Sequence, residues 1–224
     1  EALPVANLGS LTILRETRLQ TERGLGVCVG LPVPGMSVKV LPISDEPLAS
    51  FADKDTLPVG EIGEIAVCGP VVTTEYYGRP TATQAAKTHD ASGQLWHRMG
   101  DLGYIDALGR VWFCGRKSHR VITKQGTLFT IPCEGVFNTH PDVTRTALVG
   151  ALVAGETLPV LCVERTSTKP WLALCAELRD IGQRFPHTRE IKTFLEHPSF
   201  PVDIRHNAKI FREKLARWAT KKLR

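Results

Sequence analysis

The chain has 224 residues, of which 42% are hydrophobic and 23% are charged, and its formal net charge is +5. This composition is typical of a globular protein with a sizeable core and argues against a disordered chain. No apolar stretch approaches the roughly 18–20 residues that a membrane-spanning helix needs. The first residues also lack the basic start and apolar run of a signal peptide. We therefore expect a cytoplasmic protein without a transmembrane segment.

The first half of the chain is expected to be rich in β-strands. Short alternating or apolar stretches bounded by turn residues predict strands over 36–41, 64–68, 102–105 and 110–114. The last two are predicted to form a hairpin around a turn at 106–109. A short helix is predicted over 81–86, between polar loops at 44–59 and 88–94. Strands at this spacing suggest a small barrel or sandwich.

After about residue 116 the pattern changes to a mixture of strands and helices. Apolar runs predict strands over 120–124, 146–152 and 159–163. Apolar residues at helical spacing, with a proline at the start of the first, predict helices from near Pro132, over 171–181, over 189–197 and at the C-terminal end. This mixture indicates a small α+β domain. We therefore expect two domains, 1–115 and 116–224.

The distribution of basic residues, cysteines and histidines argues against nucleic-acid binding and against a transition-metal site. The basic residues near the C-terminal end alternate with Phe211, Leu215 and Trp218, as on the solvated face of an amphipathic helix. No platform of aromatic and basic strand residues accompanies them, so nucleic acid is not an expected partner. No two of the six cysteines form a Cys-x-x-Cys pair, and the seven histidines are scattered. A transition-metal site held by protein side chains is therefore not expected.

Four segments, in this order along the chain, carry the strongest functional signal. They are 63–70, followed by Tyr77-Gly78 and Pro80; 96–104; 109–117, followed by Gly126, 132–134 and 140–143; and 201–212. Together they resemble the adenylate-forming superfamily of acyl-CoA synthetases, luciferases and peptide-synthetase adenylation domains. The resemblance covers nearly the whole chain, but only the later part of the family's sequence.

This resemblance implies both a fold and an activity. The implied fold is α+β, with the β-rich, barrel-like end of a large adenylation domain over 1–115 and a small mobile C-terminal domain over 116–224. The implied activity is ATP-dependent formation of an acyl-AMP, with Mg²⁺ as a cofactor. The family's phosphate-gripping loop is not found in these residues. The chain by itself is therefore expected to be inactive.

The run from Arg205 to Leu215 is similar to the β-lactone synthetases of bacterial olefin biosynthesis. This similarity implies a long-chain β-hydroxy acid whose hydroxyl attacks the adenylate and closes a four-membered ring. AMP and pyrophosphate are released, and other enzymes of a hydrocarbon-synthesis assembly are implied partners. Two alternatives stay open: a fatty acyl-CoA ligase, which shares the first step, and a non-catalytic adenylation-like module that binds a partner protein.

The resemblance assigns roles to three residues at the reaction centre. Lys209, expected on a loop before the last helix, matches the lysine that bridges the acyl carboxylate and the α-phosphate. A cation there stabilises the charge that gathers on the phosphate oxygens in the transition state. Asp101 matches the acid that accepts hydrogen bonds from the ribose hydroxyls of ATP, and Arg116 matches an arginine that also contacts the ribose. The plain alternatives are a solvated lysine, a turn aspartate and a surface ion pair.

Three further features match the family less closely. Lys117 and Ser118 lie at the expected hinge, although many relatives carry a charged residue in place of Ser118. Gly126 matches a glycine of the small-domain hairpin, around which relatives usually place an arginine; here the only basic residue is Lys124. Glu1 stands where the family's Thr-Glu pair would place the glutamate that binds phosphate and Mg²⁺.

Overall fold

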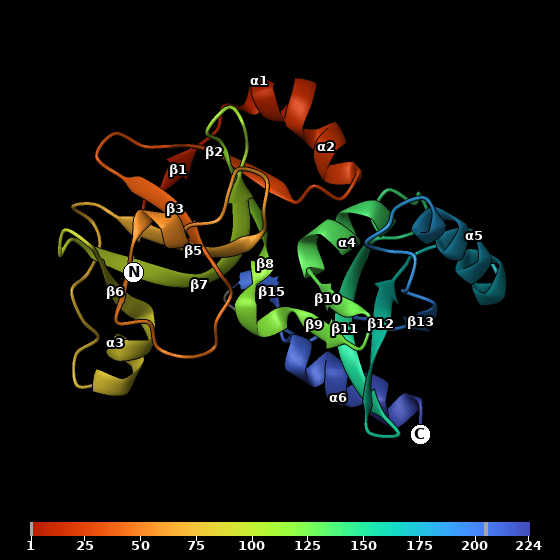
Figure 1. Cartoon of the computed structure of the whole chain (residues 1–224). Coiled ribbons are helices and arrows are strands. Elements are labelled where there is room, and N and C mark those ends of the chain that lie inside the picture. The colour runs from red at the N-terminus through yellow and green to blue at the C-terminus, as the bar shows by residue number, and fades with distance from the viewer. Residues whose placement is uncertain (1, 204–205) are drawn as a thin grey trace. The chain divides into compact units, whose positions relative to one another are not determined.

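A computed structural model describes residues 2–203 and 206–224, and for 206–208 it describes only the backbone (Figure 1). The chain forms two compact units. The first comprises Glu1–Arg18 and Gly26–Ser118, and the second comprises Leu19–Leu25 and His119–Arg224. The domain limits expected from the sequence, 1–115 and 116–224, stay a prediction. Among the described residues, no helix combines the length and the apolar character that crossing a bilayer requires.

The first unit is built on a curled, largely antiparallel sheet of eight strands, which confirms the expected barrel-like α+β architecture. Its main path runs in the order β1 (Ala6–Asn7), β2 (Val27–Pro32), β8 (Val111–Arg116), β7 (Leu95–Ile105), β5 (Gly63–Cys68) and β3 (Ser37–Leu41). Two short strands, β4 (Ser50–Phe51) and β6 (Lys87–Asp90), extend it beside β7. Central strand β7 therefore has neighbours along most of its length, and it carries Asp101.

The predicted turn between β7 and β8 is confirmed, and one carboxylate organises it. Asp106 accepts hydrogen bonds from the backbone N–H groups of Leu108 and Arg110, each at 2.9 Å. Its second oxygen accepts from Nε1 of Trp112 at 2.9 Å and from Nε of Arg110 at 2.7 Å. Gly109 supplies the positive φ of 76° that closes the turn. Local turn chemistry thus sets the register of β7 against β8.

Helices are short in the first unit. The predicted helix at 81–86 is confirmed as α3 (Pro80–Ala86), but the predicted loop at 88–94 is wrong at its start, because β6 begins at Lys87. The polar residues of β6 still form a strand because its backbone pairs with β7. The loop predicted at 44–59 is also interrupted, by β4 and a 3₁₀ turn, η2 (Asp53–Asp55). A helical segment not predicted from the sequence comprises α1 (Ser10–Thr12), the π-helical turn η1 (Ile13–Thr17) and α2 (Arg18–Glu22), and its residues from Leu19 on are assigned to the second unit.

The second unit is a sheet with helices on both faces. The sheet has the order β11 (Arg145–Val153), β12 (Glu156–Glu164) and β13 (Thr193–Glu196). Its helices are α4 (Thr130–Phe137), α5 (Trp171–Gln183) and α6 (Arg212–Lys222). Two hairpins complete it: β9 (Val121–Thr123) with β10 (Gly126–Leu128), and β14 (Val202–Asp203) with β15 (His206–Ile210).

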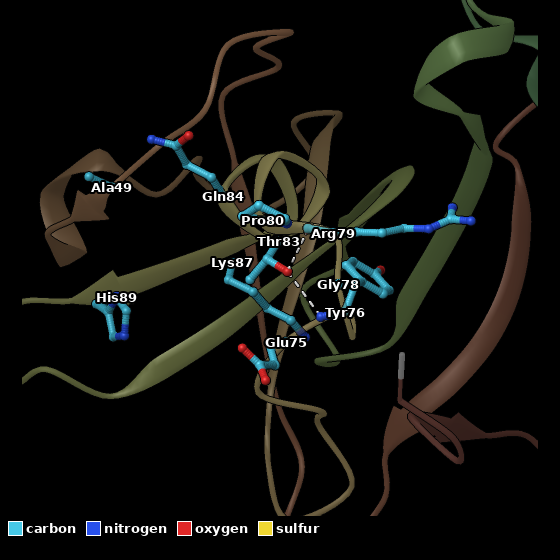
Figure 2. Close-up of a pocket in the computed structure, with 10 residues that line it drawn as sticks. All are labelled: Ala49, Glu75, Tyr76, Gly78, Arg79, Pro80, Thr83, Gln84, Lys87 and His89. Carbon is cyan, nitrogen blue, oxygen red and sulfur yellow. Dashed lines mark hydrogen bonds between the residues drawn. The ribbon is translucent and has the colours of Figure 1, made fainter.

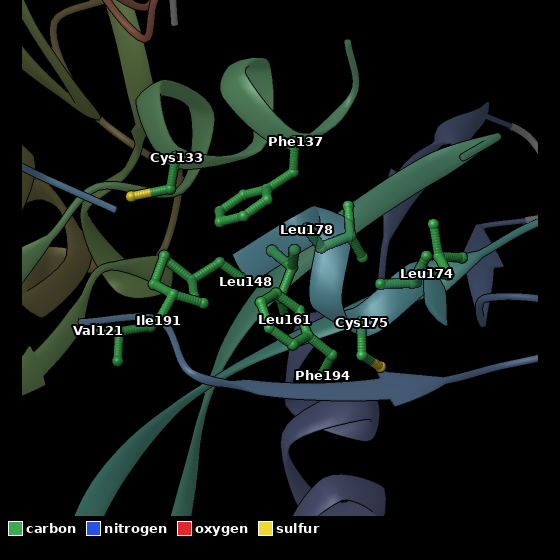
Figure 3. Packing of buried hydrophobic residues seen from close by; sticks show 11 residues of the cluster. Val121, Cys133, Phe137, Leu148, Leu161, Leu174, Cys175, Leu178, Ile191 and Phe194 are labelled. Carbon is green, nitrogen blue, oxygen red and sulfur yellow. The ribbon is translucent and has the colours of Figure 1, made fainter. Parts of the chain in front are cut away.

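Alternate residues of the sheet fill two separate cores, as the period of a strand requires. On one face, Leu148 and Leu161 pack with residues of α4 and α5, and Figure 3 shows Phe137 and Leu178 in this cluster. On the other face, Ala147, Val149, Ala151, Val160 and Cys162 pack with Phe200 and with Leu215 and Ala219 of α6. Both faces of this sheet are therefore buried, and α6 belongs to the second core.

The helix predicted over 189–197 is wrong. Residues 193–196 form strand β13, which pairs in parallel with β12. Phe194 joins the first core and the next residue, Leu195, packs against the second. A strand buried on both faces carries apolar residues without strict alternation, and over a short window that pattern is indistinguishable from a helix.

Candidate functional site

Asp101 and Arg116 lie opposite each other on neighbouring strands. Their Cα atoms are register partners in the β7–β8 pair, and Arg116 Nη1 lies 3.0 Å from Asp101 Oδ1. The same nitrogen donates to the carbonyl of Met99 at 3.2 Å. Gly100 precedes the aspartate with φ of +68°, and no atom lies within 4 Å of where a Cβ would stand. The structure thus brings together the two residues predicted to contact the ribose.

The carboxylate of Asp101 keeps unused acceptor capacity. Its Oδ1 is buried, and the contact with Arg116 is an ion pair by distance but lacks the orientation of a hydrogen bond. Burial raises the pKa of the Asp101 carboxyl, Arg116 lowers it, and the charge of Glu64 raises it. An ionised carboxylate accepts hydrogen bonds only, so this group is suited to hydroxyl donors.

A buried ion pair that sequence reasoning missed supports this strand. Glu64 on β5 and Arg98 on β7 are 1% and 4% exposed. Arg98 donates to Glu64 Oε2 from Nε at 3.1 Å and from Nη2 at 2.6 Å. Its other donors bind three backbone carbonyls, of Ser44 at 2.7 Å, Glu46 at 2.9 Å and Ala85 at 3.3 Å. All five donors of the Arg98 guanidinium therefore have acceptors. This residue lies three positions before Asp101 on the same strand.

Lys117 joins the same cluster, from the 3₁₀ turn that follows β8. Its Nζ lies 3.0 Å from Glu64 Oε1 and donates to the Ser44 carbonyl at 2.7 Å. Ser118 is exposed, and the first compact unit ends at this residue. Glu64 therefore ties the end of β8 to β5, and the hinge role expected for Lys117 and Ser118 stays a prediction.

Two cavities lined by described residues of the first unit share Tyr76 and Arg79 in their walls. One, of about 480 Å³, is drawn in Figure 2, where Thr83 of α3 accepts from the Tyr76 N–H at 2.9 Å and donates to the Arg79 carbonyl. The buried Lys87 also lines it, with its Nζ hydrogen-bonded to Thr73.

The other cavity, of about 410 Å³, reaches Gly100. It is lined by Glu64, Tyr76, Arg79, Ala82, Ala85, Ala86, Arg98, Met99, Gly100 and Lys117. The cavity has an excess of positive charge, because Arg79, Arg98 and Lys117 line it with Glu64 as their one carboxylate.

The hairpin predicted around Gly126 is present in the second unit. Its turn falls at Lys124 and Gln125, and Gly126 begins β10. Lys124 pairs with Glu156 at 2.5 Å, and both side chains are largely exposed. The role of this hairpin in the reaction stays a prediction.

Lys209 lies in strand β15 and not on the predicted loop. The correction follows from backbone pairing, because Val202 and Ile210 are register partners and the Phe211 N–H donates to the Pro201 carbonyl at 2.8 Å. The Lys209 side chain is exposed and makes no hydrogen bond or ion pair with the described residues. It belongs to the second unit, so its approach to Asp101 stays a prediction. Glu1 and Arg205 lie outside the described residues.

Comparison with known proteins links this geometry to a family. No family model matches the chain. The chain is 49% identical over 229 residues to the olefin beta-lactone synthetase of Xanthomonas campestris pv. campestris, covering 98% of this chain and 40% of that protein. It is 50% identical over 230 residues to the enzyme of the same name from Stenotrophomonas maltophilia, covering 100% of this chain and 41% of that protein. The chain belongs to the adenylate-forming enzymes.

The fold of this adenylate-forming chain agrees with solved structures. The o-succinylbenzoate CoA synthetase from Bacillus subtilis, in complex with an acyl-adenylate intermediate, superposes with a TM-score of 0.70 at 21% identity. That match covers 94% of this chain and 38% of the synthetase. At this identity the likeness concerns the fold alone. The chain spans about two fifths of the length of its curated relatives.

Proposed function

We propose that the complete protein is an ATP-dependent ligase that converts a long-chain β-hydroxy acid into a β-lactone. The observation that carries this proposal is the 50% identity to an olefin beta-lactone synthetase along the whole chain. In the first step the acid's carboxylate attacks the α-phosphorus of ATP and pyrophosphate leaves. In the second step the acid's own β-hydroxyl loses its proton and attacks the acyl carbonyl, and AMP leaves as the ring closes.

Each site residue has one part in this scheme. Asp101 accepts hydrogen bonds from the ribose hydroxyls of ATP, and Arg116 donates to the same sugar. Lys209 places an ammonium between the acyl carboxylate and the α-phosphate, where negative charge increases in the transition state. Lys117 and Ser118 form the hinge that moves the unit carrying Lys209. Glu1 is proposed as a carboxylate ligand of the Mg²⁺ that accompanies ATP, since Mg²⁺ prefers such oxygens.

The ribose role predicts a specific defect for Asp101→Asn in the complete protein. The KM for ATP is expected to rise roughly 10- to 100-fold, because a hydrogen bond to a charged group contributes about 1.5–3 kcal/mol. Since burial raises the pKa of Asp101, the wild-type enzyme loses ATP affinity as the pH falls through that pKa, and the asparagine variant should lack this acid limb. Steady-state kinetics against pH measure both effects.

The exposed Asp53, on η2 of the same unit, provides the matched control for this substitution. Asp53→Asn should leave the KM for ATP unchanged. An Asp101→Asn enzyme with a wild-type KM for ATP would remove Asp101 from the ribose site.

Product analysis tests the proposed function as a whole. The complete protein is incubated with ATP, Mg²⁺ and a long-chain β-hydroxy acid, with and without CoA. The expected product in both cases is the β-lactone, together with AMP and pyrophosphate. The lack of an arginine at the β9–β10 turn supports this outcome over thioester formation. An acyl-CoA formed only when CoA is present would identify an acyl-CoA ligase instead.

A further inference from the structure

Two elements fix the place of Lys209 in the second unit. Lys209 lies in β15, which pairs with β14, and the Phe211 N–H closes this hairpin on the Pro201 carbonyl at 2.8 Å. After it, helix α6 begins at Arg212, three residues further on. Three residues of extended chain span at most about 10 Å, so the position of Arg212 limits where Lys209 can lie.

Arg212 is held by a buried carboxylate from another helix. Its Nη1 and Nη2 lie 2.5 and 2.9 Å from the two oxygens of Glu134 on α4, a bidentate pair. The side chains are 11% and 7% exposed. The residues are 78 positions apart in the sequence, so this contact ties the start of α6 to a distant part of the same unit.

The side chains of Glu134 and Arg212 also form hydrogen bonds with backbone groups at the edge of the sheet. Leu148 lies on β11, an edge strand, and its N–H donates to Glu134 Oε1 at 2.7 Å. Its carbonyl accepts from Arg212 Nη1 at 3.2 Å. Further along β11, the N–H of Leu152 donates to Thr220 Oγ1 of α6 at 3.0 Å. Hydrogen bonds to the backbone of β11 therefore hold α6 in place, in addition to apolar packing.

Stability alone is a weak reason for such a pair. Removing two charges from water costs several kcal/mol, and a well-packed apolar pair of similar volume is often as stable or more stable. What the bidentate pair adds is a single defined position for the residue that starts α6. A catalytic group acts only within about 0.5 Å of its productive place, so a fixed junction matters most directly beside Lys209.

We propose that Glu134 and Arg212 are positioning residues that fix the ammonium of Lys209 for the adenylation step. This inference rests on the proposed function, because it assumes that Lys209 acts in acyl-AMP formation. Glu134 and Arg212 touch no substrate in this scheme, and they act through the β15–α6 junction.

The test compares Arg212→Met with Arg165→Met in the complete protein. Arg165 forms a bidentate pair with Glu196 in the same unit, at 2.9 and 3.0 Å, but that pair lies at the end of β13. We expect Arg212→Met to lower the kcat of acid-dependent pyrophosphate exchange at least tenfold, with the KM for ATP within twofold of wild type. Arg165→Met should leave both constants unchanged.

Hydrogen exchange provides a readout that does not depend on catalysis. The backbone amides of 209–211 should exchange at least tenfold faster in Arg212→Met and at the wild-type rate in Arg165→Met. Arg212→Lys keeps the charge but not the planar fork, and it should show smaller changes in the same direction. If Arg212→Met does not fold, Arg212→Lys decides by the same criteria.

Two results would overturn the proposal: wild-type kcat in the Arg212 variant, or unchanged amide exchange at 209–211. A failure of the proposed function looks different. In that case Lys209→Ala itself would leave pyrophosphate exchange intact, while the amide exchange would still report whether Arg212 orders the junction.

Discussion

Replacing Lys209 by alanine is expected to lower acid-dependent pyrophosphate exchange by the complete protein roughly 100- to 1,000-fold, the usual cost of removing one group that stabilises transition-state charge. The exposed ammonium makes no hydrogen bond or ion pair with the described residues, so little folding free energy depends on it. The loss should therefore appear in kcat, with an unchanged thermal unfolding temperature.

Lys221→Ala is the matched control for this experiment, since Lys221 is another exposed lysine in the last turn of α6. It should retain wild-type exchange. Exchange within twofold of wild type in Lys209→Ala would exclude Lys209 from the adenylation step and leave the role of this strand open.

Replacing Arg98 by methionine is expected to have the largest effect on stability. Breaking a buried ion pair from one side costs about 3–5 kcal/mol, because the remaining charge stays buried. Here the substitution leaves Glu64 with Lys117 as its cationic partner. It removes the Arg98 donors of the Glu46 and Ala85 carbonyls, and it leaves the Ser44 carbonyl with Lys117 as its donor. Denaturant unfolding of the complete protein, followed by a probe in the first unit, measures the change in the free energy of unfolding.

Two further variants define what that loss means. Combining Arg98→Met with Glu64→Leu should recover part of the stability, since the buried carboxylate of Glu64 is then removed together with its guanidinium partner. Asp53→Asn breaks an exposed ion pair with Lys39 in the same unit and should cost less than about 1 kcal/mol. A loss below 1 kcal/mol for Arg98→Met would show that the Glu64 cluster does not hold β5 and β7 together.

The sequence predicted elements well where local chemistry specifies them. The β7–β8 turn depends on Asp106 and Gly109, which act within five residues, and its position is confirmed. Strand β13 was mistaken for a helix because its apolar residues serve both faces of a buried sheet. The helical segment after Ser10 was not predicted, since Leu11 and Leu14 are exposed and form no buried stripe.

The residues of the candidate site also divide into those that sequence motifs revealed and those that they did not. Asp101, Arg116 and Lys209 were found through motifs, each within a single segment of the chain. The residues that support the site are set by tertiary contacts, such as the pairing of Arg98 with Glu64 across 34 positions. Glu64, a charged residue inside an otherwise apolar strand, was the available signal for that pair. Strand pairing, which sequence patterns do not specify, decides which buried charges meet.

The most direct test of the account is acid-dependent exchange of labelled pyrophosphate into ATP by the complete protein, without CoA. Reversible formation of an acyl-AMP requires such exchange, and a binding module would not support it. We predict exchange that depends on a long-chain β-hydroxy acid and on Mg²⁺ and that is lost in Lys209→Ala. The absence of exchange in the folded wild-type protein with any long-chain fatty or β-hydroxy acid would contradict the proposed adenylation.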